Sequence, residues 1–313
     1  MPRITRRIRA AVTALGLSAA LVAAGTASAQ AAELPEGGLL EAGAAYLVSP
    51  GAVPGANDWK CKPSAEHPNP VVLLPGTFFN IGSNFVKLSP RLKNNGYCVF
   101  GLNYGQTIIS LGRVGGLAPV RSSAKQLDAF VDKVRAATGA DKVDVIGHSQ
   151  GGAVPLSWIK QGGGAAKVAH YVGWAPSSHG TDLNGIVTFA DKLKLMGFAT
   201  GLSNVLQFPG VLDQANTSEF IKELWADGKT VPPGPDYTVI ASKSDRVVTP
   251  YTTQALDGEN THNIVLQDKC AGDGAGHAGL AFDDPTTQLT LNALADGPAD
   301  FQPKCVGFGP SFF

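Results

Sequence analysis

One serine stands in a pattern that could make it a nucleophile. Ser149 is the centre of residues 147–151, whose sequence Gly-His-Ser-Gln-Gly has the form G-x-S-x-G. The β-branched run at 142–146 predicts a buried strand before it, and the residues after the motif can begin a helix. Strand, G-x-S-x-G and helix together indicate a nucleophile elbow, a tight turn that exposes the serine hydroxyl. An ordinary turn serine is the alternative, because the bare motif also occurs by chance.

A serine nucleophile of this kind needs a base later in the chain. Among six histidines, His277 lies in a glycine-flanked loop at 274–279 that offers no core to pack into. His262 opens an apolar run and is expected to be a solvated residue at a strand end. We therefore predict that His277 takes the proton of Ser149.

The acid should lie between the serine and the histidine in the chain. Asp245 follows a predicted strand at 236–241, so it can reach a histidine in the next loop at the same edge of the sheet. Pairing with Arg246 or capping a turn is its alternative role. As the acid, Asp245 would orient His277 and stabilise the imidazolium.

An acyl transfer also needs two donors for the developing oxyanion. The backbone N–H of Gln150, the residue after the nucleophile, would be one. The other should come from the loop after the predicted strand at 70–74, where Thr77 offers a backbone N–H and a hydroxyl. A plain turn at Thr77 is the alternative.

Five segments of the chain, taken in order, resemble α/β-hydrolase lipases of the Candida antarctica lipase B type and their bacterial relatives. They are Leu74-Pro75-Gly76-Thr77, Ser149-Gln150-Gly151-Gly152, Ala175-Pro176 with Gly180-Thr181, Ser244-Asp245 with Val248 and Pro250, and His277-Ala278-Gly279. The resemblance implies a triad of Ser149, Asp245 and His277, with Thr77 and Gln150 as oxyanion donors. Ser177 stands where the fungal enzyme has an aspartate, and the segment after Thr181 matches poorly, so the substrate preference does not carry over.

The first 29 residues have the features of a secretory signal peptide. Four arginines within the first nine residues precede an apolar stretch at 10–24 and an Ala-Ser-Ala site at 27–29. A membrane anchor is the alternative, but the stretch is shorter than the ~20 apolar residues that a membrane span needs. We expect a secreted, extracellular protein with no stable membrane anchor.

Four cysteines agree with export, and their spacing fits neither a zinc site nor a C-x-x-C redox site. They allow three pairing schemes. One scheme, Cys61–Cys98 with Cys270–Cys305, joins the cysteines that are nearest in sequence. The fungal relatives have similar bridges, which favours this pairing.

Composition predicts one globular enzyme domain. The 25 basic and 25 acidic residues balance, so no nucleic-acid partner is indicated. The mature chain can bury one large core, and we expect an extended N-terminal arm at 30–69 and a catalytic domain at 70–313, as a monomer. No cofactor or metal is expected, because the C-terminal aspartates lack calcium-loop spacing and are read as solvated or capping residues: Asp268, Asp273, Asp283 and Asp284.

Strand and helix patterns alternate along this domain. Strands are predicted at 70–74, 97–102, 142–146, 167–174, 236–241 and 263–267, with an amphipathic helix at 121–137. Asp284 and Pro285 predict the N-cap and first residue of a last helix that ends at Leu294. The alternation predicts an α/β-hydrolase fold, a mostly parallel sheet with helices on both faces.

The most apolar insertion of the mature chain lies at 182–230. Core helices would explain it, but beside a catalytic serine we favour a helical cap that lines an acyl pocket. The expected function is a secreted lipase that cleaves triacylglycerol-type esters, including those at an oil–water interface. An acyltransferase and a polyester depolymerase or cutinase are the alternatives on the same fold. A non-catalytic binding protein would need a broken triad.

Overall fold

The computed structural model describes residues 32–195, 207–228 and 230–312. One compact unit spans Glu33–Phe313. The predicted signal peptide lies outside the described residues, as does the part of the predicted cap at 196–206. Among the helices of these described ranges, none combines the length and the apolar sequence that a membrane span requires.

A six-stranded sheet forms the centre of this unit. Its strands are β1 (Val71–Leu74), β2 (Val99–Gly101), β3 (Val143–His148), β4 (Val168–Trp174), β5 (Asp236–Ala241) and β6 (Thr261–Val265). They lie in the order β2-β1-β3-β4-β5-β6, and every neighbouring pair is parallel. The predicted parallel sheet is therefore confirmed. β6 begins and ends two residues earlier than predicted, because Leu266, which suggested its continuation, begins the helix α9 (Leu266–Lys269).

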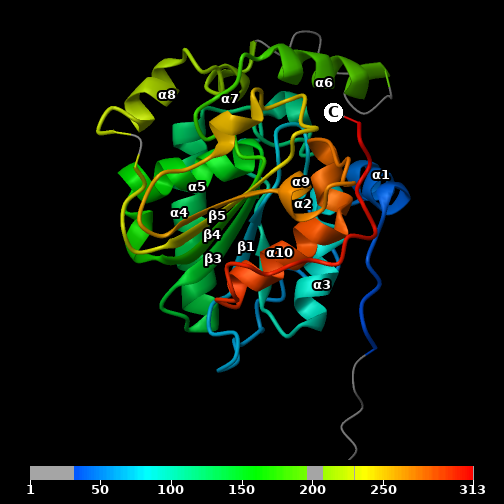
Figure 1. Ribbon diagram of the computed structural model, residues 1–313. Helices are drawn as coiled ribbons and strands as arrows, with labels where there is room; N and C mark the ends of the chain where they lie inside the picture. Colours follow the sequence, from blue (N-terminus) through cyan, green and yellow to red (C-terminus); the bar gives the residue numbers. More distant parts are fainter. Residues whose placement is uncertain (1–31, 196–206, 229, 313) are drawn as a thin grey trace, which may run out of the picture. The chain divides into compact units, whose positions relative to one another are not determined.

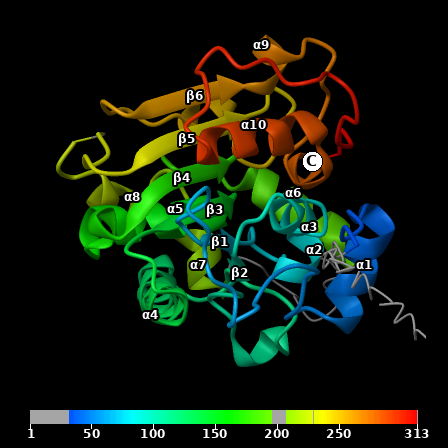
Figure 2. The ribbon, with the colours of Figure 1, turned by 90° about the horizontal axis from the view of Figure 1, so that it is seen from below.

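Helices cover both faces of the sheet (Figures 1 and 2). The helices α4 (Val120–Thr138) and α5 (Gln150–Gln161) lie on one face, and α3 (Leu88–Asn94) and α10 (Asp284–Leu294) on the other. Val72 packs with α4 and α5, while its neighbour Val71 packs with α3 and α10. Because strand side chains alternate between faces, a strand covered on both sides is apolar throughout.

The remaining described elements are short connections and additions around this core. They are α1 (Leu39–Val48), α2 (Ile81–Asn84), η1 (Ile108–Ser110), η2 (Gly164–Ala166), α6 (Asn184–Leu195), α7 (Pro209–Leu212), α8 (Glu219–Leu224), η4 (Tyr251–Gln254) and η5 (Ala278–Phe282).

Two local predictions need correction. The arm predicted to be extended contains α1, whose Tyr46 is buried in an apolar cluster with Phe78, so tertiary packing stabilises a helix there. The N-cap of α10 is Asp283 rather than Asp284, because the Asp283 carboxylate accepts the N–H of Thr286 at 2.7 Å. Asp284 becomes the first helical residue.

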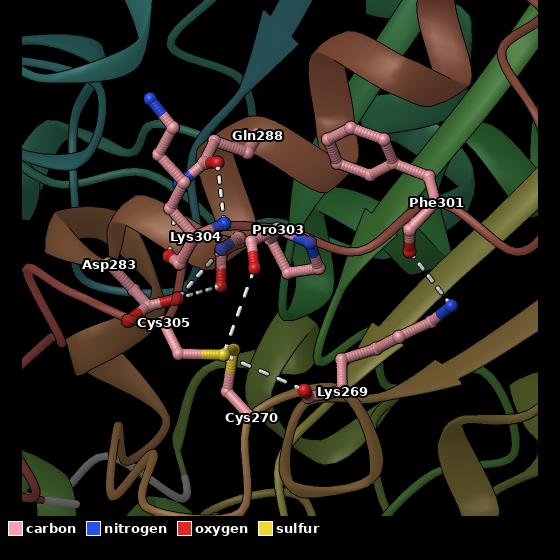
Figure 3. Close-up of a disulfide and its surroundings, with 9 residues drawn as sticks. Lys269, Cys270, Asp283, Gln288, Phe301, Pro303, Lys304 and Cys305 are labelled. Atoms are coloured by element: carbon pink, nitrogen blue, oxygen red, sulfur yellow. Dashed lines mark hydrogen bonds between the residues drawn. A yellow bond between two sulfur atoms is a disulfide. The ribbon is translucent and has the colours of Figure 1, made fainter.

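Two disulfides join the cysteines that are close in sequence. Cys61 pairs with Cys98 and Cys270 with Cys305, with Cα–Cα distances of 5.7 and 5.5 Å. The second bridge holds the C-terminal segment near α9, where Lys269 also donates to the carbonyl oxygen of Phe301 at 2.9 Å (Figure 3). In the chain-entropy model, closure of each loop by its disulfide stabilises the folded state by about 3–4 kcal/mol.

Candidate active site

Ser149 forms the sharp turn between β3 and α5. Its backbone has φ 58° and ψ −125°, a strained conformation for a residue with a side chain. A Cβ on Gly147 would lie 2.0 Å from the carbonyl oxygen of Gly151, and one on Gly151 would lie 2.3 Å from that of Leu74. Both positions therefore require glycine. The structure thus contains the strand, turn and helix that the sequence predicts around Ser149.

His277 and Asp245 meet beside this turn. The Nδ1 atom of His277 lies 2.8 Å from Oδ2 of Asp245, and both side chains are buried. Asp245 Oδ1 accepts the backbone N–H groups of Val247 and Val248 at 2.7 and 3.0 Å. Gln254 donates its side-chain amide to Oδ2 at 2.9 Å. Four donors thus fix the carboxylate, and the engaged Nδ1 leaves Nε2 of His277 for a proton from a nucleophile.

Gln150 is the first residue of α5, so its backbone N–H is one of the donors that a helix N-terminus leaves without an intrahelical partner. The side chain of Gln150 points away into the protein. Its Nε2 donates to the carbonyl oxygens of Gly116 and Gly210 at 3.1 and 2.5 Å. Only the backbone of this residue is therefore placed to serve an oxyanion.

Thr77 lies in the loop after β1. Its hydroxyl oxygen accepts the side-chain amide of Gln214 at 3.0 Å, and Gln214 in turn accepts the hydroxyl of Ser177 at 3.2 Å. Because the Thr77 oxygen accepts from Gln214, its own hydrogen can point into the site. Ser177, which replaces the aspartate of the fungal enzymes, thus supports Gln214 in this chain.

Ser149, His277 and Thr77 line one small cavity. Its volume is about 10 Å³, which is room for about one water molecule. The other lining residues are apolar: Phe78, Phe79, Ile186, Phe189 and Val247. The structure therefore brings together the residues that the sequence assigned to the nucleophile, the base and one oxyanion donor, under an apolar cover.

Comparison with known proteins identifies the family. The family model described as Lipase (class 2) matches residues 68–290. The chain belongs to the class 2 lipase family. The predicted resemblance to α/β-hydrolase lipases is thereby confirmed.

Two solved structures are similar to this class 2 lipase in fold. Lipase B of Aspergillus fumigatus is 21% identical with a TM-score of 0.60, over 79% of this chain and 56% of that protein. A soluble variant of monoglyceride lipase from Saccharomyces cerevisiae is 16% identical with a TM-score of 0.51, over 74% of this chain and 86% of that protein. The chain thus spans little more than half of the Aspergillus enzyme. Together with the parallel sheet, these matches confirm the α/β-hydrolase fold.

The inserted segment of this class 2 lipase divides between two apolar clusters. Ile186 and Phe189 of α6 and Val211 of α7 belong to one apolar cluster with Phe78, and Ile186 and Phe189 line the cavity. Phe220 of α8 instead packs in the core with α4 and α5. α6, α7 and α8 all lie at the same end of the sheet (Figure 1). Among the described residues of the insertion, Ile186 and Phe189 line the cavity with Ser149.

Proposed function

We propose that this class 2 lipase hydrolyses carboxylic esters through an acyl-enzyme on Ser149. The observation that carries the proposal is the 2.8 Å contact between His277 Nδ1 and Asp245 beside the strained turn of Ser149. His277 Nε2 takes the proton of Ser149 as Oγ bonds to the carbonyl carbon, and the oxyanion is held by Gln150 and Thr77. His277 then returns the proton to the leaving alcohol. Water then attacks the acyl-enzyme with the same proton transfers through His277, and the carboxylic acid is released.

The apolar wall of the cavity supports acyl esters of medium to long chain length as substrates. Ile186 and Phe189 close the space in front of Ser149, so an acyl chain must displace them and would then pack against α6. This cover also favours a lipase over a polyester depolymerase, which needs an open site. The two disulfides fit an oxidising, extracellular location and support export with residues 1–29 as the signal peptide.

Phe189→Ala tests the proposed acyl pocket. Each acyl CH₂ buried against this wall is worth up to about 0.8 kcal/mol, so kcat/KM should rise from acetate to octanoate in the unaltered enzyme. Phe189→Ala should lower the octanoate-to-acetate ratio of kcat/KM about 10-fold, measured with p-nitrophenyl esters. The ratio is insensitive to the fraction of folded protein.

Phe220→Ala is the matched control. It is the same substitution in the same insertion, but Phe220 packs in the core with α4 and α5. It should lower the melting temperature and leave the ratio unchanged. A preference for acetate, with both variants equal on all esters, would show instead a short-chain esterase whose α6 is merely core.

Thr77→Val tests the second oxyanion donor. The variant keeps the backbone N–H and the shape of the side chain but removes the hydroxyl that Gln214 orients. We expect kcat to fall by about 10²-fold with a small change in KM, as for deletion of one such donor. Steady-state kinetics on p-nitrophenyl butyrate measure this. An unchanged kcat would mean that only backbone N–H groups hold the oxyanion.

A further inference from the structure

His148, the residue before the nucleophile, links the two loops of the site. It ends β3 and its side chain is fully buried. Its Nδ1 lies 3.0 Å from Oδ1 of Asn84, and its Nε2 lies 3.1 Å from the backbone carbonyl oxygen of His277. One imidazole thus contacts Asn84, the last residue of α2, and the backbone of the residue proposed as the base.

The contact with Asn84 reaches the loop that carries Thr77. Asn84 Oδ1 also accepts the backbone N–H of Gly76 at 2.8 Å, and Gly76 directly precedes Thr77. A Cβ on Gly76 would lie 3.1 Å from Nδ1 of His148 and 3.2 Å from Cβ of Ser149. The loop therefore packs directly on both His148 and Ser149, with little room to shift.

The contact with His277 acts on the backbone of that residue. Asp245 holds the imidazole of His277 from one side, and His148 lies at its carbonyl oxygen, with the two imidazole centroids 4.8 Å apart. Asp245 fixes how the ring is turned. His148 limits where the backbone that carries the ring can lie.

His148 has only one N–H group for its contacts with Asn84 and with the carbonyl oxygen of His277. Burial, together with the nearby charge that His277 would carry, lowers the pKa of His148 well below its usual value, so the imidazole is neutral. A neutral imidazole has one N–H, yet both neighbouring atoms are oxygens. Asn84 cannot turn its amide over, because the N–H of Gly76 needs Oδ1 where it is.

We propose that His148 is a positioning residue that couples the oxyanion loop to the catalytic base. Its single N–H serves either Asn84 or the carbonyl of His277, and its ring contacts both residues. This inference rests on the proposed ester hydrolysis. It predicts that loss of His148 affects turnover rather than substrate binding.

Three variants separate the two contacts. His148→Asn places an amide near the position of Nδ1 and can still reach Asn84, whereas His148→Gln places one near Nε2 and can still reach the carbonyl of His277. His148→Phe fills the space and removes both contacts. Val131→Ala, in the core of α4 and away from the site, serves as a control for lost stability.

We expect His148→Phe to lower kcat for p-nitrophenyl butyrate by about 10- to 100-fold with KM within about 3-fold, as misplacement of reacting groups does. His148→Asn and His148→Gln should each recover part of that loss. Val131→Ala should keep the kcat of the folded enzyme even at an equal fall in melting temperature.

The proposal is overturned if folded His148→Phe turns over as fast as the unaltered enzyme, or if neither amide variant exceeds it. A fluorophosphonate assay on the unaltered protein tests the proposed function separately. If Ser149 is not labelled there, the ester-hydrolase proposal itself fails, and the coupling proposal fails with it.

Discussion

Replacement of Ser149 with alanine is expected to lower kcat for ester hydrolysis by about 10⁶-fold, as loss of the nucleophile does in serine hydrolases. No other group can form the acyl-enzyme, so only substrate binding and the oxyanion donors remain to accelerate attack by water. The fold should persist, because alanine carries the same strain as serine at φ 58°. Initial rates on p-nitrophenyl butyrate and a thermal melt measure the two effects.

Ser157→Ala is a suitable control for this variant. Ser157 is also buried and lies further along α5, outside the cavity. It should retain activity and labelling by a fluorophosphonate, which peptide mapping should locate on Ser149. Normal turnover by Ser149→Ala, or a label on another serine, would remove Ser149 from the mechanism.

The elbow was predictable from sequence because its causes are local. Residues within ten positions of Ser149 supply the strand, the two glycines and the start of the helix, and a Cβ at Gly147 or Gly151 has no room. The contact between His277 and Asp245 was predictable for a different reason. Parallel strands place their following loops at one edge of the sheet, so chain order indicates which side chains meet.

The residues that support the site were not predictable. Gln214, Gln254 and Asn84 hold Thr77, Asp245 and Gly76 through buried amides. A side-chain amide that pairs with a partner more than 100 positions away, as Gln214 does with Thr77, leaves no spacing in the sequence. Only the unusual burial of these glutamines and the asparagine marks them, and burial is a property of the fold.

Helix limits show the same division between local and distant causes. Asp283 and Asp284 are equally good N-caps by residue type, and the sequence favoured Asp284 only because proline is common at the first helical position. Contacts with residues that are distant in sequence distinguish the two aspartates. Gly309 donates to Asp283 at 2.9 Å, while Lys87 and Arg91 pair with Asp284 at 3.0 and 3.1 Å. The one-residue error at α10 has this cause.

Replacement of Asp245 with asparagine is expected to lower kcat by about 10⁴-fold, as the equivalent change does in serine proteases. The N–H groups of Val247 and Val248 hold Oδ1, so the new NH₂ group must occupy the place of Oδ2. There it faces His277 Nδ1, to which it can only donate, and it no longer accepts the side-chain amide of Gln254. His277 then carries its proton on Nε2, where it cannot accept the proton of Ser149.

The pH dependence and the histidine variants distinguish this explanation from simple loss of structure. Asp245→Asn should recover activity at alkaline pH, because hydroxide can replace the missing base, while its melting temperature should fall only by the loss of the Gln254 hydrogen bond, about 1 kcal/mol. His277→Ala should lose about 10⁶-fold in kcat, since the base itself is gone. His262→Ala, at an exposed position on β6, should keep full activity. If His262→Ala is the inactive variant, or Asp245→Asn turns over normally at pH 7, the base and the acid must be sought elsewhere in the fold.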